Sequence, residues 1–262
     1  MSAASTAPAP VRSPLPAGLA GSTVLVIGGS SGIGLGAARL LHGLDVRVVL
    51  SGRDKARLDA AVESVAAGEG DAEVLGAVAD AADEDAVRAA FDLAGQVDHV
   101  LLTAGGYTGA GPLAELTRET AHEAYDQRVW AALVAARIAA ERMPAGGSLT
   151  FTSGNLVVRP TPGIVGAMAP GGGVETLTRV LAVELAPQRL RVNTVRYGAF
   201  DTPLLRGVGG LPTDEAVREA GAALPLGRFG TAEEAGAASV FLMANTYMTG
   251  QVVTVDGGQI LA

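Results

Sequence analysis

A glycine-rich segment near the amino end carries the first sign of chemistry. Residues 24–34 read Val-Leu-Val-Ile-Gly-Gly-Ser-Ser-Gly-Ile-Gly, a run typical of a buried strand that leads into a loop. A loop from a parallel strand into a helix presents free helix N–H groups, which together with the helix dipole attract a pyrophosphate. A tight strand-helix turn without a ligand is the alternative interpretation. The residues expected to hold a dinucleotide here are Gly28, Ser30, Ser31, Gly32, Ile33 and Gly34.

The end of the second predicted strand bears on which dinucleotide is bound. That strand ends in Leu50-Ser51-Gly52-Arg53. An acidic residue at this point usually meets a free ribose 2′-hydroxyl, and the chain has Gly52 there instead. Arg53 offers a forked donor that suits a 2′-phosphate, which favours NADP(H) over NAD(H). The alternative is that Arg53 is an ordinary solvated residue at the start of a helix.

Other groups that could do chemistry are few. Lys55 is the only lysine among the 262 residues, so no tyrosine is followed by a lysine four positions later. The chain has no cysteine, which excludes thiolate catalysis and zinc–thiolate sites. Its three histidines, His42, His99 and His122, lack the spacing of metal ligands, and we therefore expect no metal site.

Composition narrows the class of protein further. The formal net charge of −8 argues against a nucleic-acid partner, because no surplus of cations exists to displace counterions. No apolar run approaches the roughly 20 residues of a membrane span. The first residues lack the basic start and apolar core of a signal peptide, so we expect a cytoplasmic protein. Residues 1–20 are rich in Pro, Ala and Ser and are expected to form a mobile tail.

Short β-branched runs alternate with longer helical patterns from Thr23 onward. This alternation predicts an α/β fold: a single doubly wound Rossmann domain over residues 21–262, with a mostly parallel sheet of about seven strands and helices on both faces. The predicted strands are 23–28, 46–51, 73–79, 98–103, 148–152, 190–196 and 251–255. The predicted helices are 33–43, 54–67, 83–94, 117–142, 173–186 and 231–243. Irregular stretches at 153–172 and 197–213 follow strands, where such sheets place their ligand crevice.

These features together resemble the short-chain dehydrogenase/reductase family over roughly residues 20–260. Residues 28–34 are similar to the family's TGxxxGIG motif, with Ile27 in place of the threonine. Leu102-Thr103-Ala104-Gly105 is similar to its NNAG motif, with only Ala-Gly kept, and residues 191–203 and 249–258 resemble its last two strands and the turns after them. The cofactor-binding residues that the resemblance adds are Asp80, Ala81, Ala104, Gly105, Gly106, Gly198 and Thr202.

The catalytic part of the family's pattern is altered in this chain. The family uses a Ser, a Tyr whose hydroxyl carries the proton, a Lys that lowers the pKa of that Tyr, and an Asn on the long helix. By the resemblance, Ser153 fits the serine position, with Gly154 as the alternative. The tyrosine and lysine positions fall on Ala167 and Gly171, and the asparagine position falls on Arg128.

Three residues are therefore expected to do the catalytic work. Ser153 can form a hydrogen bond with a substrate oxygen. Arg128 can stabilise an oxyanion, or it can pair with a carboxylate. Tyr197, after the sixth strand, can bring a phenol to the substrate, or it can pack against the cofactor or the loop. Asn155 and Arg159 are further candidates.

The sequence leaves three functions open. We expect an NADP(H)-dependent oxidoreductase that acts on a small carbonyl or hydroxyl substrate in specialised biosynthesis. The alternatives are a non-redox cyclase, dehydratase or isomerase on this scaffold, and a non-catalytic NADP-binding protein. Glycines 171–173 are expected to leave space beside the nicotinamide. The resemblance also implies a homodimer or homotetramer, and alanines within 131–140 would let two helices approach closely unless they face the sheet.

Overall fold

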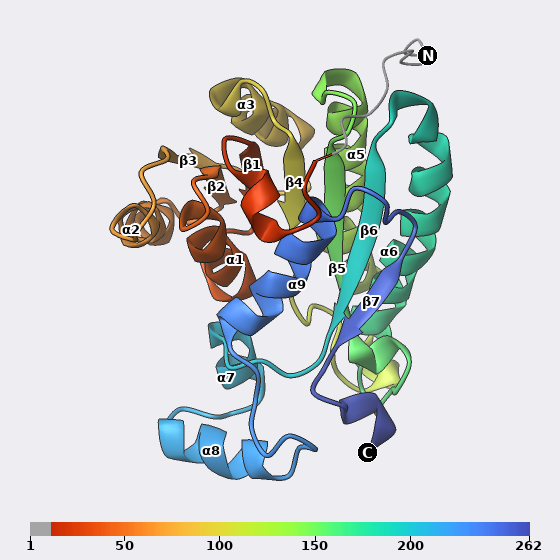
Figure 1. The fold of residues 1–262 in the computed structure, drawn as a ribbon. Coiled ribbons are helices and arrows are strands. Elements are labelled where there is room, and N and C mark those ends of the chain that lie inside the picture. The colour runs from red at the N-terminus through yellow and green to blue at the C-terminus, as the bar shows by residue number, and fades with distance from the viewer. Residues whose placement is uncertain (1–11) are drawn as a thin grey trace.

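The computed structural model describes residues 12–262 as one seven-stranded sheet with helices on both faces (Figure 1). The strands pair in the order β3-β2-β1-β4-β5-β6-β7, and every pairing is parallel. Their bounds are β1 Thr23–Ile27, β2 Arg47–Gly52, β3 Val74–Val78, β4 His99–Leu102, β5 Ser148–Gly154, β6 Arg191–Tyr197 and β7 Val252–Val255. The prediction of a doubly wound α/β domain is confirmed, and its sheet is wholly parallel.

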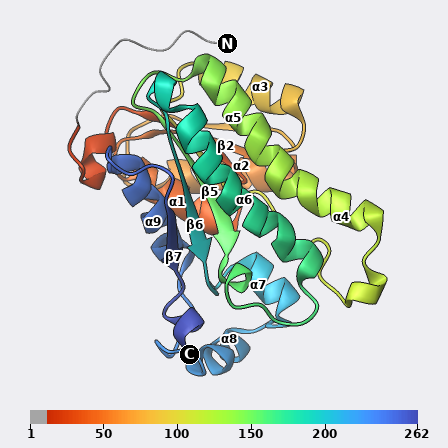
Figure 2. The same ribbon diagram turned by 90° about the vertical axis from the view of Figure 1, so that its right-hand side faces the viewer.

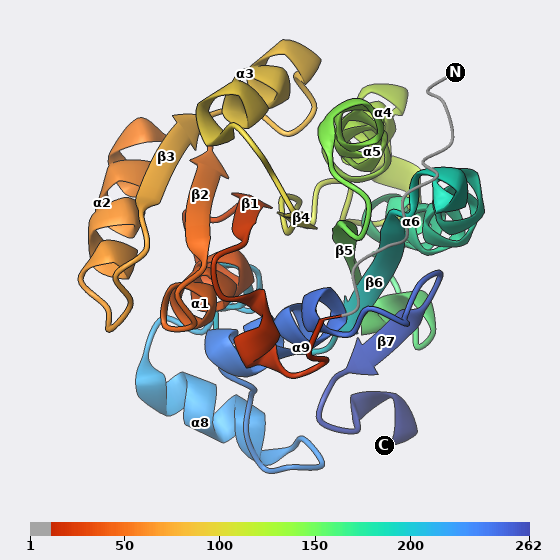
Figure 3. The ribbon, with the colours of Figure 1, turned by 45° about the horizontal axis from the view of Figure 1, so that its top comes forward.

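Nine α-helices, counted over residues 12–262, connect and cover these strands. Their bounds are α1 Gly32–His42, α2 Lys55–Ala66, α3 Glu84–Ala94, α4 Arg118–Tyr125, α5 Ala131–Arg142, α6 Val165–Glu184, α7 Pro203–Val208, α8 Asp214–Ala222 and α9 Ala232–Ala244. Helices α1 and α9 lie on one face of the sheet, and α3, α5 and α6 lie on the other (Figure 3).

Strand β1 shows how the pattern of residues builds these two layers. Leu25 and Ile27 point into the core cluster under α3, α5 and α6, whereas Val24 and Val26 point into the cluster under α1 and α9. Neighbouring side chains of a strand point to opposite faces, so a strand that is buried on both sides reads as a continuous apolar run. Because the strands are parallel, their carboxyl ends lie along one edge of the domain, and α7 and α8 lie at that edge (Figure 2).

The alanines of α5 face the sheet and not the outside of the domain. Ala131, Ala132, Ala135, Ala136 and Ala139 are all at most 2 % exposed and belong to the core cluster beside the sheet. They therefore pack inward, and they offer no smooth surface to a second subunit. The homodimer or homotetramer stays a prediction.

Helix α6 begins eight residues earlier than predicted, so the expected irregular stretch 153–172 is wrong from Val165 onward. Pro170 lies inside this helix and lacks the N–H that would bond to a carbonyl one turn earlier. Tertiary packing outweighs this loss: Gly166 lies so close to the backbone of Gly109 that an added Cβ would overlap it. The glycines and prolines of this segment predicted a loop, but in the folded protein the segment packs closely against its neighbours as a helix.

Helices α7 and α8 were not predicted: α7 lies in residues 197–213, which were expected to be irregular, and no element was predicted for the residues of α8. Both begin at a threonine cap: Thr202 accepts a hydrogen bond from the Leu205 N–H at 3.3 Å, and Thr213 accepts one from Ala216 at 3.2 Å. The Arg206 guanidinium binds the carboxylates of Asp201 at 2.6 Å and Asp214 at 2.8 Å, which ties the two short helices together.

The predicted tail of residues 1–20 is wrong in its last part. Pro16–Leu19 forms a short 3₁₀ helix, η1, and Leu19 is 2 % exposed because it packs into the core cluster with α9. Residues 1–11 of the predicted tail lie outside the described residues. Within residues 12–262, the helices are too short or too polar to cross a membrane.

Candidate active site

The glycine loop after β1 adopts a shape that other residues would not tolerate. Gly28 has a φ of +93°, and a Cβ there would lie 2.5 Å from the Ala104 amide nitrogen. A Cβ at Gly34 would lie 2.5 Å from the Thr103 hydroxyl and would overlap the Gly28 carbonyl oxygen. Gly32 has a φ of +55°, in the left-handed region that favours glycine. The loop therefore packs against the end of β4 and leaves a backbone surface for a ligand.

The N-terminus of α1 is open toward that surface. Ser31 is the N-cap residue, but its side chain makes no capping hydrogen bond. The first N–H groups of a helix have no partner within the helix, so they remain available to an anion. Ser30, Ser31 and Ile33 are half-buried beside them. This cradle of glycines and N–H donors fits the pyrophosphate of a dinucleotide.

Two further strand ends meet the glycine loop. Thr202, after β6, lies opposite it, and a Cβ at Gly32 would be 3.6 Å from the Thr202 Cβ. After β4, Thr103 donates a hydrogen bond to the Gly28 carbonyl at 3.1 Å. Ala104 and Gly106 continue from there, with Gly105 between them at a φ of +139°. Segments more than 70 residues apart in the sequence thus meet at the carboxyl edge of the sheet.

The residues expected near the adenosine end lie at the ends of β2 and β3. Arg53 and Asp80 approach to 3.8 Å, and their side chains are 69 % and 47 % exposed. Gly52 explains the missing acid at this point, because any Cβ there would lie 2.8 Å from the Ser30 hydroxyl. Ala81 is 7 % exposed and its side chain belongs to the core, so only its backbone is available to a ligand.

Ser153 is part of a buried charge network that sequence reasoning missed. Its hydroxyl donates to the Glu175 carboxylate at 2.8 Å, and both residues are 5 % exposed. Arg196 holds the same carboxylate through Nε at 2.8 Å and through Nη2 at 2.5 Å, and this contact raises the pKa of Arg196. The available signal was weak, because Glu175 is one of three charged residues on α6 and Arg196 is one of two arginines on β6.

Arg128 lies in a π-helical turn, η3 Asp126–Trp130, between α4 and α5. Such turns are frequent at functional sites. Its Nη2 donates to the Gly106 carbonyl at 2.7 Å, and no carboxylate of residues 12–262 lies within ion-pair distance. Burial lowers the pKa of this guanidinium. Of the two roles considered, pairing with a protein carboxylate is therefore wrong.

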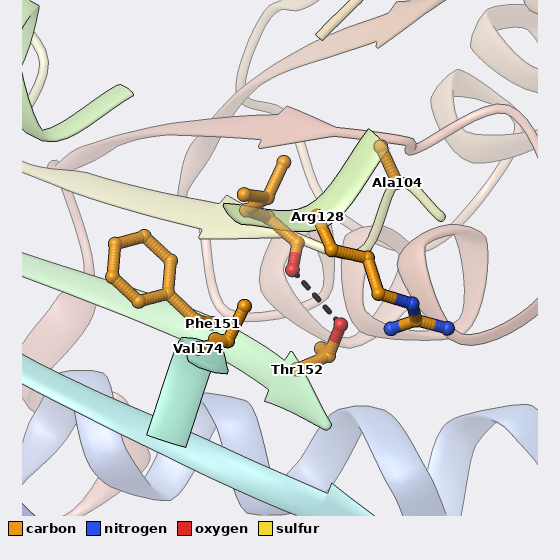
Figure 4. A pocket seen from close by; sticks show the side chains of 6 residues that line it. Ala104, Arg128, Phe151, Thr152 and Val174 are labelled. Atoms are coloured by element: carbon orange, nitrogen blue, oxygen red, sulfur yellow. Dashed lines mark hydrogen bonds between the residues drawn. The ribbon is translucent and has the colours of Figure 1, made fainter. Parts of the chain in front are cut away.

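A small cavity shows how the Arg128 side chain is directed. Ala104, Thr152, Phe151 and Val174 line this cavity together with Arg128. Figure 4 shows the guanidinium turned away from Phe151 and Val174, while Thr152 donates to the Leu102 carbonyl at 3.2 Å. The cationic end of Arg128 therefore lies near the loop after β4, beside Gly105 and Gly106.

The structure contradicts the catalytic role expected for Tyr197. Its hydroxyl is buried against α9, where it contacts the Ala235 carbonyl at 2.9 Å and the Ser239 hydroxyl at 2.8 Å. Burial raises the pKa of this phenol far above its ordinary value. The ring also packs edge-on against Phe200, with centroids 5.5 Å apart. Tyr197 is therefore a core residue held by α9, and its contact with Phe200 agrees with the alternative of packing against the loop.

The space expected beside Gly171–Gly173 is occupied. Val157 lies 3.3 Å from where a Gly171 Cβ would be and 3.6 Å from that of Gly172, while Val129 lies 3.1 Å from that of Gly173. The glycines therefore let neighbouring side chains approach the helix closely, and the expectation of an open volume there is wrong.

Gln259, near the carboxyl end, binds the remaining candidates. Asn155 donates to its side-chain oxygen at 3.0 Å, and Arg159 donates to its backbone carbonyl. The same side-chain oxygen accepts the Ala199 N–H at 2.8 Å, and any Cβ at Gly198 would overlap it. Asn155, Arg159 and Gly198 thus hold the C-terminal turn against the loops around the crevice.

The sequence and the fold are both similar to those of known proteins. Residues 27–259 match a family model described as Enoyl-(Acyl carrier protein) reductase. Together with the fold, the glycine loop and the relatives below, this match shows that the chain belongs to the short-chain dehydrogenase/reductase family.

Three relatives stand out among those it resembles. Short-chain dehydrogenase/reductase ATR9 of Stachybotrys chlorohalonatus is 33 % identical, over 92 % of this chain and 98 % of the relative. The structure of MalC Reductase/Diels-Alderase from Malbranchea aurantiaca is 31 % identical, with a TM-score of 0.86 over 93 % of this chain and 98 % of that one. A small-chain dehydrogenase solved in complex with NADPH is 31 % identical, with a TM-score of 0.74 over 92 % and 99 %.

Proposed function

We propose that this protein is an NADP(H)-dependent oxidoreductase of atypical site chemistry, acting on a small carbonyl or hydroxyl compound of specialised biosynthesis. The observation that carries the proposal is the N-terminus of α1, which has no side-chain cap and lies in a glycine cradle beside Thr202. The family supports a nicotinamide cofactor, and the relative in complex with NADPH supports the phosphorylated form. The names of ATR9 and MalC are compatible with an oxidoreductase.

The cofactor, when bound, supplies hydride transfer, so the protein must position the substrate and stabilise charge. Arg128 is the residue that we assign to an oxyanion, because it is half-buried, cationic and without an ion-pair carboxylate among residues 12–262. Ser153 is assigned to the substrate oxygen. Ala167 and Gly171 stand where the family has its tyrosine and lysine, and the chain has no Tyr-x-x-x-Lys to take their place.

A single-turnover experiment tests this function. The purified protein is mixed with one equivalent of NADPH and challenged with a panel of ketones, enones and quinones, and NADPH oxidation is followed by its absorbance. We expect oxidation with at least one class of carbonyl compound, and its rate should fall strongly in Arg128→Met. Complete inertness of a protein that demonstrably binds NADPH would contradict the proposal.

Arg53 tests the choice of cofactor. The exchange Arg53→Asp removes a forked donor for the 2′-phosphate and adds a negative charge, so we expect NADP(H) binding to weaken about 100-fold, with little loss for NAD(H). Arg57→Asp, on the exposed side of α2, is the matched control and should leave both affinities nearly unchanged. Equal weakening of both cofactors by Arg53→Asp would show that Arg53 does not read the phosphate.

A second candidate is a non-redox cyclisation on the same scaffold. It is favoured by the likeness to MalC, whose structure is described as a reductase and Diels-Alderase. A reaction of that kind needs a shaped, partly apolar pocket and no catalytic proton carrier. Product formation by cofactor-stripped protein would support it, whereas strict dependence on NADPH oxidation would rule it out.

A further inference from the structure

The position of one proton decides what Ser153 can offer a ligand. A serine hydroxyl has one donor hydrogen and two acceptor lone pairs. Within the described part of the chain, Ser153 Oγ has two hydrogen-bond neighbours, the Glu175 carboxylate at 2.8 Å and the Gly171 carbonyl at 3.4 Å. Both neighbours can only accept when Glu175 is ionised. The Ser153 proton is therefore directed at one of them, and the charged, closer Glu175 is the stronger acceptor.

Arg196 binds and orients the Glu175 carboxylate beside Ser153. The guanidinium binds both carboxylate oxygens of Glu175, and the two side chains are 14 % and 7 % exposed. A second nitrogen of Arg196 donates to the Thr254 hydroxyl at 3.1 Å, which fixes the guanidinium between β6 and β7. A two-pronged ion pair of this kind is geometrically specific, so it also fixes the oxygen that faces Ser153.

The lone pairs of Ser153 Oγ have no donor among the described residues. Ser153 lies at the carboxyl end of β5, the edge at which sheets of this type bind ligands. We propose that Ser153 acts there as a hydrogen-bond acceptor, positioned by Glu175 and Arg196, and that the site consequently selects a hydroxyl compound over the matching carbonyl compound. This inference rests on the proposed function, because that function places the substrate at Ser153.

A matched pair of probes tests the inference by equilibrium binding. The probes are 2-tetralol and 2-tetralone, which share one carbon skeleton; the hydroxyl of the first can donate a hydrogen bond, and the carbonyl of the second can only accept one. Their affinities are measured calorimetrically with the full chain, both without cofactor and with 1,4,5,6-tetrahydro-NADP, which cannot transfer a hydride. We expect 2-tetralol to bind about tenfold more tightly, the effect of one added hydrogen bond to a charge-linked group.

Two variants separate this role from a merely structural one. Ser153→Ala keeps the Glu175–Arg196 pair, and the ratio of the two affinities should fall to about one. Glu175→Gln removes the carboxylate charge at the oxygen that Ser153 shares with Arg196 Nε, so the serine proton is held less strongly. The preference for 2-tetralol should therefore weaken in this variant. A thermal melt confirms folding, and if Glu175→Gln fails to fold, wild type and Ser153→Ala decide alone.

Three results would overturn the inference: 2-tetralone binding at least as tightly as 2-tetralol in the wild type, an unchanged ratio in Ser153→Ala, or no binding of either probe at millimolar concentration. These outcomes are distinct from failure of the proposed function. A protein that does not bind NADPH, or does not oxidise it, can still discriminate between the two probes in the cofactor-free measurement.

Discussion

Replacing Glu175 by alanine is expected to lower the free energy of unfolding by about 3–5 kcal/mol, because it leaves the Arg196 guanidinium without its counter-charge in a buried setting. The Ser153 hydroxyl loses its acceptor in the same step. The two partners come from α6 and β6, so the loss falls on the contact between this helix and the sheet. Urea denaturation of the full chain, followed by circular dichroism, measures the effect.

Two controls show whether charge is the cause. The double exchange Glu175→Met with Arg196→Met removes both charges and fills their volume, so it should cost far less than the single exchange. Glu141→Ala breaks the exposed pair with Arg88 on the surface, where water replaces the lost contact, and it should have little effect. A single exchange at Glu175 that is as mild as Glu141→Ala would contradict the description of a buried ion pair.

Replacing Gly34 by alanine is expected to raise the dissociation constant for NADPH about 100-fold. An added Cβ would lie 2.5 Å from the Thr103 hydroxyl and would overlap the Gly28 carbonyl, so the loop has to move away from the end of β4. Overpacking of this kind costs about 1–3 kcal/mol in stability as well. Calorimetric titration with NADPH and a thermal melt measure the two effects.

Gly43→Ala provides the matched control for that exchange. Gly43 is the C-cap residue of the same helix, at a φ of −64°, and a Cβ there would be 3.6 Å from the nearest atom, the Arg39 carbonyl oxygen. This exchange should leave NADPH binding unchanged. If Gly34→Ala bound NADPH as tightly as Gly43→Ala, the cradle after β1 would not be the cofactor site.

The sheet could be predicted because its information is local. The strands at the centre of the sheet, such as β1, are apolar runs, and helical patterns follow them that begin at a cap such as Asp54 or Asp83. Both of these side chains accept a hydrogen bond from a first-turn N–H. The glycine loop could be read for the same reason, since the need for glycine at positions 28 and 34 arises where a strand turns into a helix.

The details of the active site depend on contacts between distant segments, and these contacts could not be predicted from the sequence. Tyr197 follows the right strand, but its ring fits a pocket formed by α9, almost 40 residues later. Glu175 and Arg196 form an ion pair only because α6 packs on β6 in the folded protein. Helix α6 extends through Pro170, and its Gly166 packs on Gly109. This contact joins distant segments, so local sequence patterns do not predict it.

Calorimetric titration of the full chain with NADPH, and then with NADH, is the decisive measurement, because the proposed function requires that the protein bind NADP(H). We expect a micromolar dissociation constant for NADPH and an affinity for NADH that is at least about tenfold weaker. No measurable binding of NADPH at millimolar concentration, or tighter binding of NADH, would contradict it.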